Sequence, residues 1–160
     1  SYMKRISMLS HFVLGLSLAI APVGAWLAVR GSFAWTPVVI GTAVIFWVAG
    51  FDILYSCQDV DFDRRELLHS IPATLGVPWA LGLARVSHLA AVVYLALVPT
   101  VEPLHIAYFG GLLLIVALFA YEHSLVKAHD LSRIDAAFFT VNGWIGVLYL
   151  ATVLVAGRLA

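Results

Sequence analysis

The sequence has little charge and almost no cysteine. Only 11% of its 160 residues are charged, whereas an ordinary soluble domain is about 25% charged. The formal net charge is zero at pH 7, so the chain offers no basic surface for nucleic acid. Its single cysteine, Cys57, excludes an internal disulfide and a multi-cysteine zinc site. We expect Cys57 to be a small buried filler in an apolar core.

Glycine-rich phosphate loops and a nucleophile elbow are also missing, and apolar residues dominate instead, at 62% of the chain. A bilayer span needs about 20 mostly apolar residues. Uncharged stretches of about that length lie between Arg5 and Arg30, between Arg30 and Asp52, between Glu102 and Glu122, and between Asp135 and Arg158. A fifth candidate span covers roughly residues 74–98, with Arg85 near its start, where a long side chain can reach the interface.

These spans predict an all-α fold: a polytopic transmembrane helical bundle with five spans, forming one domain over residues 1–160 of an integral membrane protein. A large soluble helical core is the alternative, and it fits this hydrophobicity poorly.

The positive residues predict how the bundle is oriented in the membrane. With five spans, every lysine and arginine except Arg30 and Arg158 falls on or near one side, which we expect to be cytoplasmic. All acidic residues except Glu102 share that side, which suggests a polar reaction chamber.

The most informative segment runs from Asp52 to Arg64, directly after the second predicted span. Carboxylates are expensive next to a bilayer and are therefore functional candidates. Nothing between Gly50 and Leu68 breaks a helix, so we expect the segment to be helical. At roughly 100° per residue, Asp52, Asp59 and Asp63 then lie within about 40° of one another, with Tyr55 at the edge of their face and Asp61 pointing away.

Like charges one helical turn apart repel, so this face needs a cation, and oxygen ligands favour a hard one such as Mg2+. Diphosphate chemistry suits it, because Mg2+ between carboxylates and a diphosphate stabilises the leaving group. Asp59 and Asp63 can reach one ion, whereas Asp52 either ligates the metal or contacts substrate. The alternative is a solvated acidic helix end.

Further polar residues are candidates for binding a diphosphate or an aromatic carboxylate: Lys4, Arg5, Arg64, His69, Ser70 and Asn142. Arginine's planar fork suits both anions. For the cations, the open alternative is that they anchor the interface or pair with nearby acids. His69 is otherwise an exposed loop residue, and Asn142 is otherwise bonded to a neighbouring helix. His88 and His105 have no partner at metal-ligand spacing, and we assign them no role.

The pattern Asp52-x-x-Tyr55-x-x-Gln58-Asp59-x-x-x-Asp63 resembles the second aspartate-rich motif of the UbiA superfamily of intramembrane aromatic prenyltransferases. Residues 69–72 resemble the segment after that motif, residues 1–5 the lead-in to the family's fifth span, and residues 138–142 the start of its last span. Residues 59–65 and 68–72 resemble the 4-hydroxybenzoate branch, which includes relatives proposed for menaquinone synthesis by the futalosine route. Ser10-His11 and the residues that follow resemble those menaquinone relatives in particular.

This resemblance implies Mg2+-dependent transfer of a polyprenyl group from its diphosphate to an aromatic ring, during ubiquinone or menaquinone synthesis in a bacterial inner membrane. The acceptor would be 4-hydroxybenzoate or a naphthoquinone-carboxylate type of acid. Asp59 and Asp63 would bind Mg2+ with help from Asp52, and Tyr55 would line the reacting centre. Lys4 and Arg5 would contact the diphosphate or the aromatic carboxylate.

The chain departs from the family in two places. The family has nine spans and a first motif of the N-D-x-x-D-x-x-x-D kind, which is absent here, so we expect the C-terminal five spans, inactive without an N-terminal half. Leu67 stands where this branch usually has glycine. Two rival functions stay open: a cation transporter that uses the aspartates, and an inactive remnant. A transporter should place its acids near mid-membrane, which disfavours the first rival.

Overall fold

The computed structural model describes residues 2–160, and their regular structure is helical apart from an isolated bridge between Lys127 and Asp130. The long helices are α1 (Ser10–Arg30), α2 (Trp35–Ser56), α5 (Val77–Leu97), α6 (Ala107–Leu125) and α7 (Asn142–Leu159). The short α-helices are α3 (Val60–Arg65) and α4 (Ile71–Leu75), and the 3-10 turns are η1 (Tyr2–Arg5), η2 (Cys57–Asp59) and η3 (Val98–Thr100). A π-helical segment, η4 (Ala136–Val141), leads directly into α7.

Five helical stretches are long and apolar enough to cross a bilayer, as the sequence predicts. They are Ser10–Arg30, Trp35–Arg65, Val77–Thr100, Ala107–Leu125 and Ala136–Leu159. A helix satisfies its backbone hydrogen bonds within one segment, which is why it can cross lipid. These stretches confirm the predicted polytopic helical bundle and point to an integral membrane protein.

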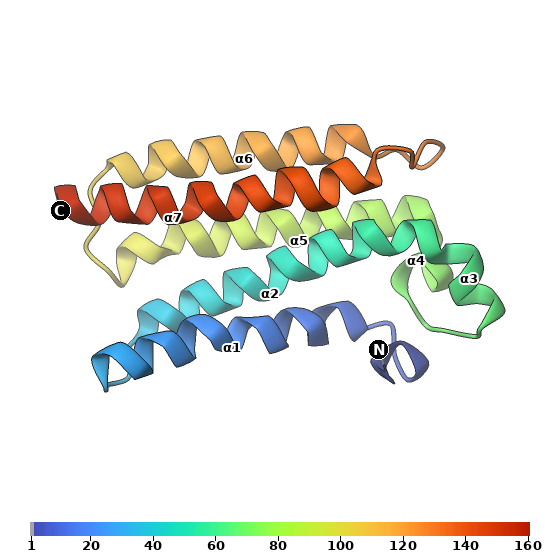
Figure 1. Ribbon diagram of the computed structural model, residues 1–160, viewed down its shortest axis with the longest axis horizontal. Helices are drawn as coiled ribbons and strands as arrows, with labels where there is room; N and C mark the ends of the chain where they lie inside the picture. The colour runs from blue at the N-terminus through green and yellow to red at the C-terminus, as the bar shows by residue number, and fades with distance from the viewer. Residues whose placement is uncertain (1) are drawn as a thin grey trace.

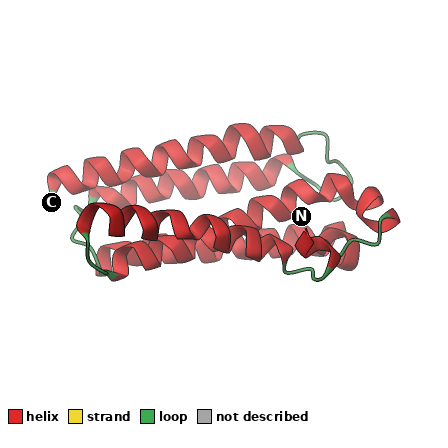
Figure 2. Ribbon diagram, turned by 60° about the horizontal axis from the view of Figure 1, so that its bottom comes forward, coloured by secondary structure: helices red, strands yellow, loops and turns green. Residues whose placement is uncertain are grey.

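The long helices run nearly parallel to one axis, with α1, α2 and α5 side by side and the α6–α7 pair beside them (Figures 1 and 2). Helices α1 and α2 approach closely at Gly15, where a Cβ atom would collide with the carbonyl oxygen of Ile45. Such small residues let membrane helices pack backbone to backbone. Phe46 of α2 stacks on Tyr94 of α5 with ring centroids 5.7 Å apart, which joins the next pair of helices.

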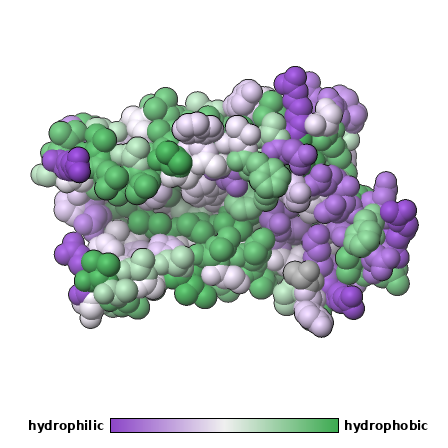
Figure 3. Space-filling view, viewed as in Figure 1, coloured by the Kyte–Doolittle hydropathy of each residue, from purple (hydrophilic) through white to green (hydrophobic). Residues whose placement is uncertain are grey.

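Hydrophilic residues gather at one end of the bundle (Figure 3). That end carries α3, α4, the N-terminal segment and the connection between α6 and α7 (Figure 1). Large apolar side chains such as Leu113 and Leu150 are exposed elsewhere, which suits contact with lipid. The predicted gathering of charge at one side is therefore present in the fold, while its cytoplasmic orientation stays a prediction.

The acidic segment is helical but not one regular α-helix. Helix α2 ends at Ser56, and the 3-10 turn η2 separates it from α3. Ser56 Oγ and Cys57 Sγ both donate to the Ile53 carbonyl oxygen, at 2.9 and 3.4 Å, and such back-bonding bends helices. A 3-10 turn advances about 120° per residue, so three residues rotate the later side chains by roughly 60° beyond the predicted phase. The expectation of constant α-helical phase from Asp52 to Asp63 is wrong for this reason.

Helix α3 ends in a Schellman motif centred on Leu67. The Leu68 N–H donates to the Asp63 carbonyl oxygen at 2.8 Å, and the Leu67 N–H donates to the Arg64 carbonyl oxygen at 3.3 Å. Leu67 therefore adopts a left-handed conformation with φ of 54°, although its side chain is exposed. Glycine is the usual residue at this position of the motif because it has no Cβ to clash.

Replacing Leu67 with glycine should therefore stabilise the protein. The change removes about 1–2 kcal/mol of left-handed strain and costs about 0.5–1 kcal/mol of chain entropy. We expect thermal unfolding in detergent to occur at a higher temperature. Glu66→Gly is the matched control, because Glu66 has φ of −87° and should only lose stability. Equal destabilisation by both variants would show that Leu67 is not strained.

Candidate functional site

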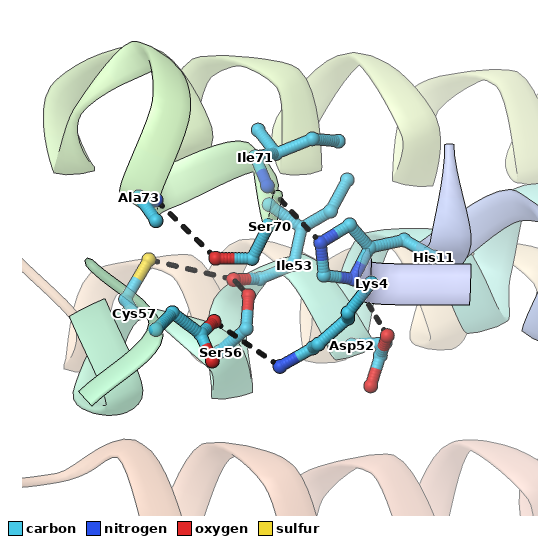
Figure 4. A network of polar contacts seen from close by, with 10 residues as sticks. Lys4, His11, Asp52, Ile53, Ser56, Cys57, Ser70, Ile71 and Ala73 are labelled. Carbon is cyan, nitrogen blue, oxygen red and sulfur yellow. Dashed lines mark hydrogen bonds and ion pairs between the residues drawn. The ribbon is translucent and has the colours of Figure 1, made fainter. Parts of the chain in front are cut away.

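Asp52 lies near the end of α2 and is bonded to a histidine of α1. Its Oδ2 atom is 2.6 Å from His11 Nδ1, as Figure 4 shows. The imidazole is completely buried, whereas 24% of the Asp52 side chain is exposed. The other ring nitrogen, His11 Nε2, accepts the Ile71 N–H at 3.3 Å. One histidine thus joins α1, α2 and the start of α4.

Asp63 of α3 is buried and pairs with Lys4 of η1. The distance from Lys4 Nζ to Asp63 Oδ2 is 3.2 Å, and the Lys4 side chain is 22% exposed. The Lys4 carbonyl oxygen accepts the His69 N–H at 2.6 Å. The N-terminal turn is therefore fixed against α3 by a charge pair and against the 69–71 segment by a backbone hydrogen bond.

Two cavities open beside these contacts. One, of about 290 Å3, has Lys4 and Asp52 in its wall together with apolar side chains of α1. The other, of about 540 Å3, is lined by Tyr2, Arg5, Phe62, Glu66 and Leu68. The predicted anion-binding residues Lys4 and Arg5 therefore line neighbouring hollows, each of which also contains a carboxylate.

The remaining candidates near the acidic segment have varied environments. Asp59 is half-buried at the start of α3, and Asp61 is exposed. Arg64 is exposed, and its Nε donates to the Ala73 carbonyl oxygen at 3.2 Å. His69 is exposed as well. Ser70 is buried, and its Oγ accepts the Ala73 N–H at 3.3 Å, so this side chain caps α4.

Tyr55 and Asn142 belong to an aromatic region formed by α2, η4 and α7. The Tyr55 ring packs on Phe138 of the π-helical segment with centroids 4.2 Å apart. Asn142 Oδ1 accepts a hydrogen bond from Trp47 Nε1 at 2.6 Å. This bond joins α7 to α2, as expected under the alternative that Asn142 is bonded to a neighbouring helix. A largely apolar cavity of about 440 Å3 lies here, lined by residues of α1, α2, η4 and α7 that include Trp47, Phe138 and Asn142.

Two buried polar groups escaped sequence reasoning. His11 entered it only as part of a resemblance, although a histidine within an apolar run is itself a signal for a polar partner. His88 Nδ1 is 3.0 Å from His123 Nε2 and 3.8 Å from Glu122 Oε2, and His88 Nε2 is 3.3 Å from the Trp47 carbonyl oxygen. Nothing in the spacing of His88 and His123 indicates that α5 and α6 bring them together.

The polar connection between α6 and α7 forms a turn of its own. Asp130 Oδ1 accepts hydrogen bonds from Ser132 N at 3.1 Å and Ser132 Oγ at 2.6 Å. These bonds favour the carboxylate and hold the pKa of Asp130 below its ordinary value. This turn lies at the polar end, but the described contacts do not join it to Asp52 or Asp63.

The acidic segment offers an incomplete oxygen ligand set for Mg2+. Among the described residues, no three histidine, cysteine or acidic side chains are close enough to hold a metal by themselves. Asp59 and Asp63 are four residues apart in and beside α3, a spacing that makes side chains neighbours on a helix. Mg2+ commonly takes only one or two carboxylates and completes its shell with water and substrate phosphates. The donors present fit that mode of binding.

These features define a class: a polytopic helical membrane protein with several carboxylates at one polar end and an apolar, aromatic cavity in the bundle. The model of the UbiA prenyltransferase family matches residues 1–156. The chain therefore belongs to the UbiA prenyltransferase family.

Curated relatives and a solved structure agree with this family. The chain is 29% identical over 155 residues to a 4-hydroxybenzoate octaprenyltransferase of Tolumonas auensis, covering 97% of this chain and 54% of that protein. It is 30% identical over 159 residues to the enzyme of the same name from Xanthomonas oryzae, covering 98% and 52%. The apo structure of a UbiA homologue from Aeropyrum pernix superposes with a TM-score of 0.80 at 30% identity, covering 95% of this chain and 57% of that one. The chain spans about half the length of the curated relatives it matches.

Removing the charge of Lys4 should destabilise the polar end. Lys4→Met leaves the Asp63 carboxylate buried without its partner, which should lower the free energy of unfolding by about 1–3 kcal/mol. Thermal or denaturant unfolding in detergent measures this loss. Asp63→Asn in the Lys4→Met background should recover most of it, because the buried charge is then gone as well. Arg5→Met is the control: Arg5 is exposed, and an equal loss there would contradict the role of the pair.

Proposed function

We propose that this protein acts in the transfer of a polyprenyl group from polyprenyl diphosphate to an aromatic ring in quinone biosynthesis. The observation that carries this proposal is the position of Asp52, Asp59, Asp63 and Lys4 at the polar end of an apolar bundle that belongs to the UbiA family. The names of the curated relatives, 4-hydroxybenzoate octaprenyltransferase, support the same reaction class.

The two kinds of cavity suit the two ends of a prenyl diphosphate. The hollow beside Lys4 provides a cation for an anionic headgroup. The 440 Å3 cavity lined by Trp47, Phe138 and Asn142 is mostly apolar, so it suits an isoprenoid chain. Tyr55 packs on Phe138, which lines the apolar cavity, and it is three residues from Asp52, which lines the hollow beside Lys4.

We further propose that Asp59 and Asp63 would hold Mg2+, with Asp52 placed to assist substrate positioning. The chemistry that Mg2+ supplies in such sites is neutralisation of a diphosphate as it leaves. Lys4 orients Asp63 through their ion pair. Arg5 faces the larger cavity, where its guanidinium suits a diphosphate or the carboxylate of an aromatic acid. His69 and Ser70 belong to the 69–73 segment and Arg64 is bonded to it, so these residues would act through the position of that segment.

The finer assignments are part of the same proposal. The acceptor is 4-hydroxybenzoate or a naphthoquinone-carboxylate type of acid, and the membrane is a bacterial inner membrane with the polar end in the cytoplasm. The positive residues near that end support this orientation. The chain matches about half of the relatives' length. The proposed catalytic unit would also include the family's first aspartate motif, which belongs to the other half.

Prenyl transfer by the full-length protein, measured with radiolabelled polyprenyl diphosphate and each acceptor, tests this function. Asp59→Asn should reduce the rate at least about 100-fold, as expected when charge stabilisation of the reacting group is lost. Asp61→Asn is the matched control because Asp61 is exposed and lies only two residues further along, in α3. Chelation of divalent cations should abolish transfer, and added Mg2+ should restore it.

Full activity of Asp59→Asn, or an equal loss in Asp61→Asn, would contradict the metal assignment. Absence of transfer to any aromatic acid, combined with metal-dependent ion flux in liposomes, would replace the proposed function with transport. Asp63→Asn is informative only beside its unfolding temperature, because Asp63 also holds Lys4.

A further inference from the structure

His11 is completely buried among three separate elements of the polar end. It belongs to the first turns of α1, yet its Nδ1 contacts Asp52 near the end of α2, and its Nε2 contacts the backbone N–H of Ile71 where α4 begins (Figure 4). Burying a polar ring in this way is costly unless both nitrogens are bonded. Both are bonded here.

The two contacts determine which nitrogen carries the proton. A backbone N–H can only donate, so His11 Nε2 must accept the Ile71 N–H and is unprotonated. In a neutral imidazole the hydrogen then resides on Nδ1, which donates to Asp52 Oδ2 at 2.6 Å. A doubly protonated ring would place two donors against each other at Ile71. The hydrogen-bond network therefore assigns the neutral Nδ1–H tautomer.

The bond to His11 leaves part of Asp52 available. Only Oδ2 is bonded within the described chain, and 24% of the side chain is exposed, in the wall of the cavity that also holds Lys4. An N–H donor on one oxygen fixes the direction of the other oxygen.

The 69–71 segment is hydrogen-bonded to residues on both sides of this cavity. The His69 N–H binds the Lys4 carbonyl oxygen at 2.6 Å, and the Ile71 N–H binds His11 Nε2 at 3.3 Å. Ser70 between them is buried and caps α4, which fixes the local backbone. The Lys4 backbone and the partner of the Asp52 carboxylate are therefore both bonded to one short piece of chain.

We propose that His11 is a positioning residue: through its Nδ1–H it holds the Asp52 carboxylate toward the cavity shared with Lys4, and through its Nε2 it ties that carboxylate to the 69–71 segment. The proposal rests on the proposed function for the role of Asp52 in prenyl transfer. The geometry of His11 itself does not depend on that function.

Two substitutions separate the two bonds of His11. The amide nitrogen of asparagine reaches about as far as Nδ1, so His11→Asn retains a donor for Asp52 but loses the acceptor for Ile71. The carbonyl oxygen of glutamine reaches about as far as Nε2, so His11→Gln retains the acceptor but removes the donor. Both variants are compared in the full-length protein for kcat, KM and unfolding temperature.

We expect His11→Gln to lower kcat about 10–100-fold with little change in the KM for polyprenyl diphosphate, as for other residues that orient a reacting group through a hydrogen bond. His11→Asn should keep a kcat within a few-fold of the parent while its unfolding temperature falls. A kcat that follows unfolding temperature alone across the two variants, or a larger kcat loss in His11→Asn, would overturn the positioning role.

Nitrogen-15 NMR of histidine-labelled full-length protein provides a readout that needs no activity. His11 should show a protonated Nδ1 and a bare Nε2, and Asp52→Asn should perturb the Nδ1 signal more than the Nε2 signal. The opposite tautomer, or two protonated nitrogens, would overturn the inference. If the tautomer is found but no prenyl transfer occurs, the proposed function fails while the assignment of the His11 hydrogen bonds stands.

Discussion

The cost of removing carboxylates from water is the constraint on which the polar end of this protein depends. Asp63 is buried and Asp52 half-buried beside a bundle that is otherwise apolar, so each needs a partner. Lys4 serves Asp63, and His11 serves Asp52. Because these partners come from the first residues of the chain, the N-terminal turn and α1 must pack against the end of α2. The acids thereby organise the segment that surrounds them, in addition to any charge that they present to a substrate.

A second set of polar contacts joins the helices farther into the bundle. Trp47 of α2 donates its indole N–H to Asn142 of α7, and its carbonyl oxygen is bonded to His88 of α5. His88 in turn contacts His123 of α6. Four helices are thus linked in sequence by groups that have few other partners in an apolar setting. Such contacts contribute modest energy, but they restrict how membrane helices rotate and slide against one another.

The polar end and the aromatic cavity meet where helix geometry is least regular. A 3-10 turn follows Tyr55, and a π-helical segment carries Phe138, on which the Tyr55 ring packs. Both are departures from i to i+4 bonding, and π-helical turns often occur at functional sites. Leu67 adds a third irregularity at the end of α3, where the left-handed backbone suits glycine, which has no Cβ to clash. These three irregularities lie at the end of the molecule that carries the candidate chemistry.

Local sequence patterns determined the helical class, the five spans and the gathering of charge, because each follows from the length and polarity of a continuous stretch. The burial of Cys57 was predictable in the same way.

Only the tertiary structure decided which partners Asp52 and Asp63 have. His11 and Asp52 are 41 residues apart, and Lys4 and Asp63 are 59 apart, so no helical period relates them. The 3-10 turn at Cys57–Asp59 was also not predictable from the sequence. A hydroxyl and a thiol both donate there to one carbonyl oxygen, and no proline or glycine marks the position.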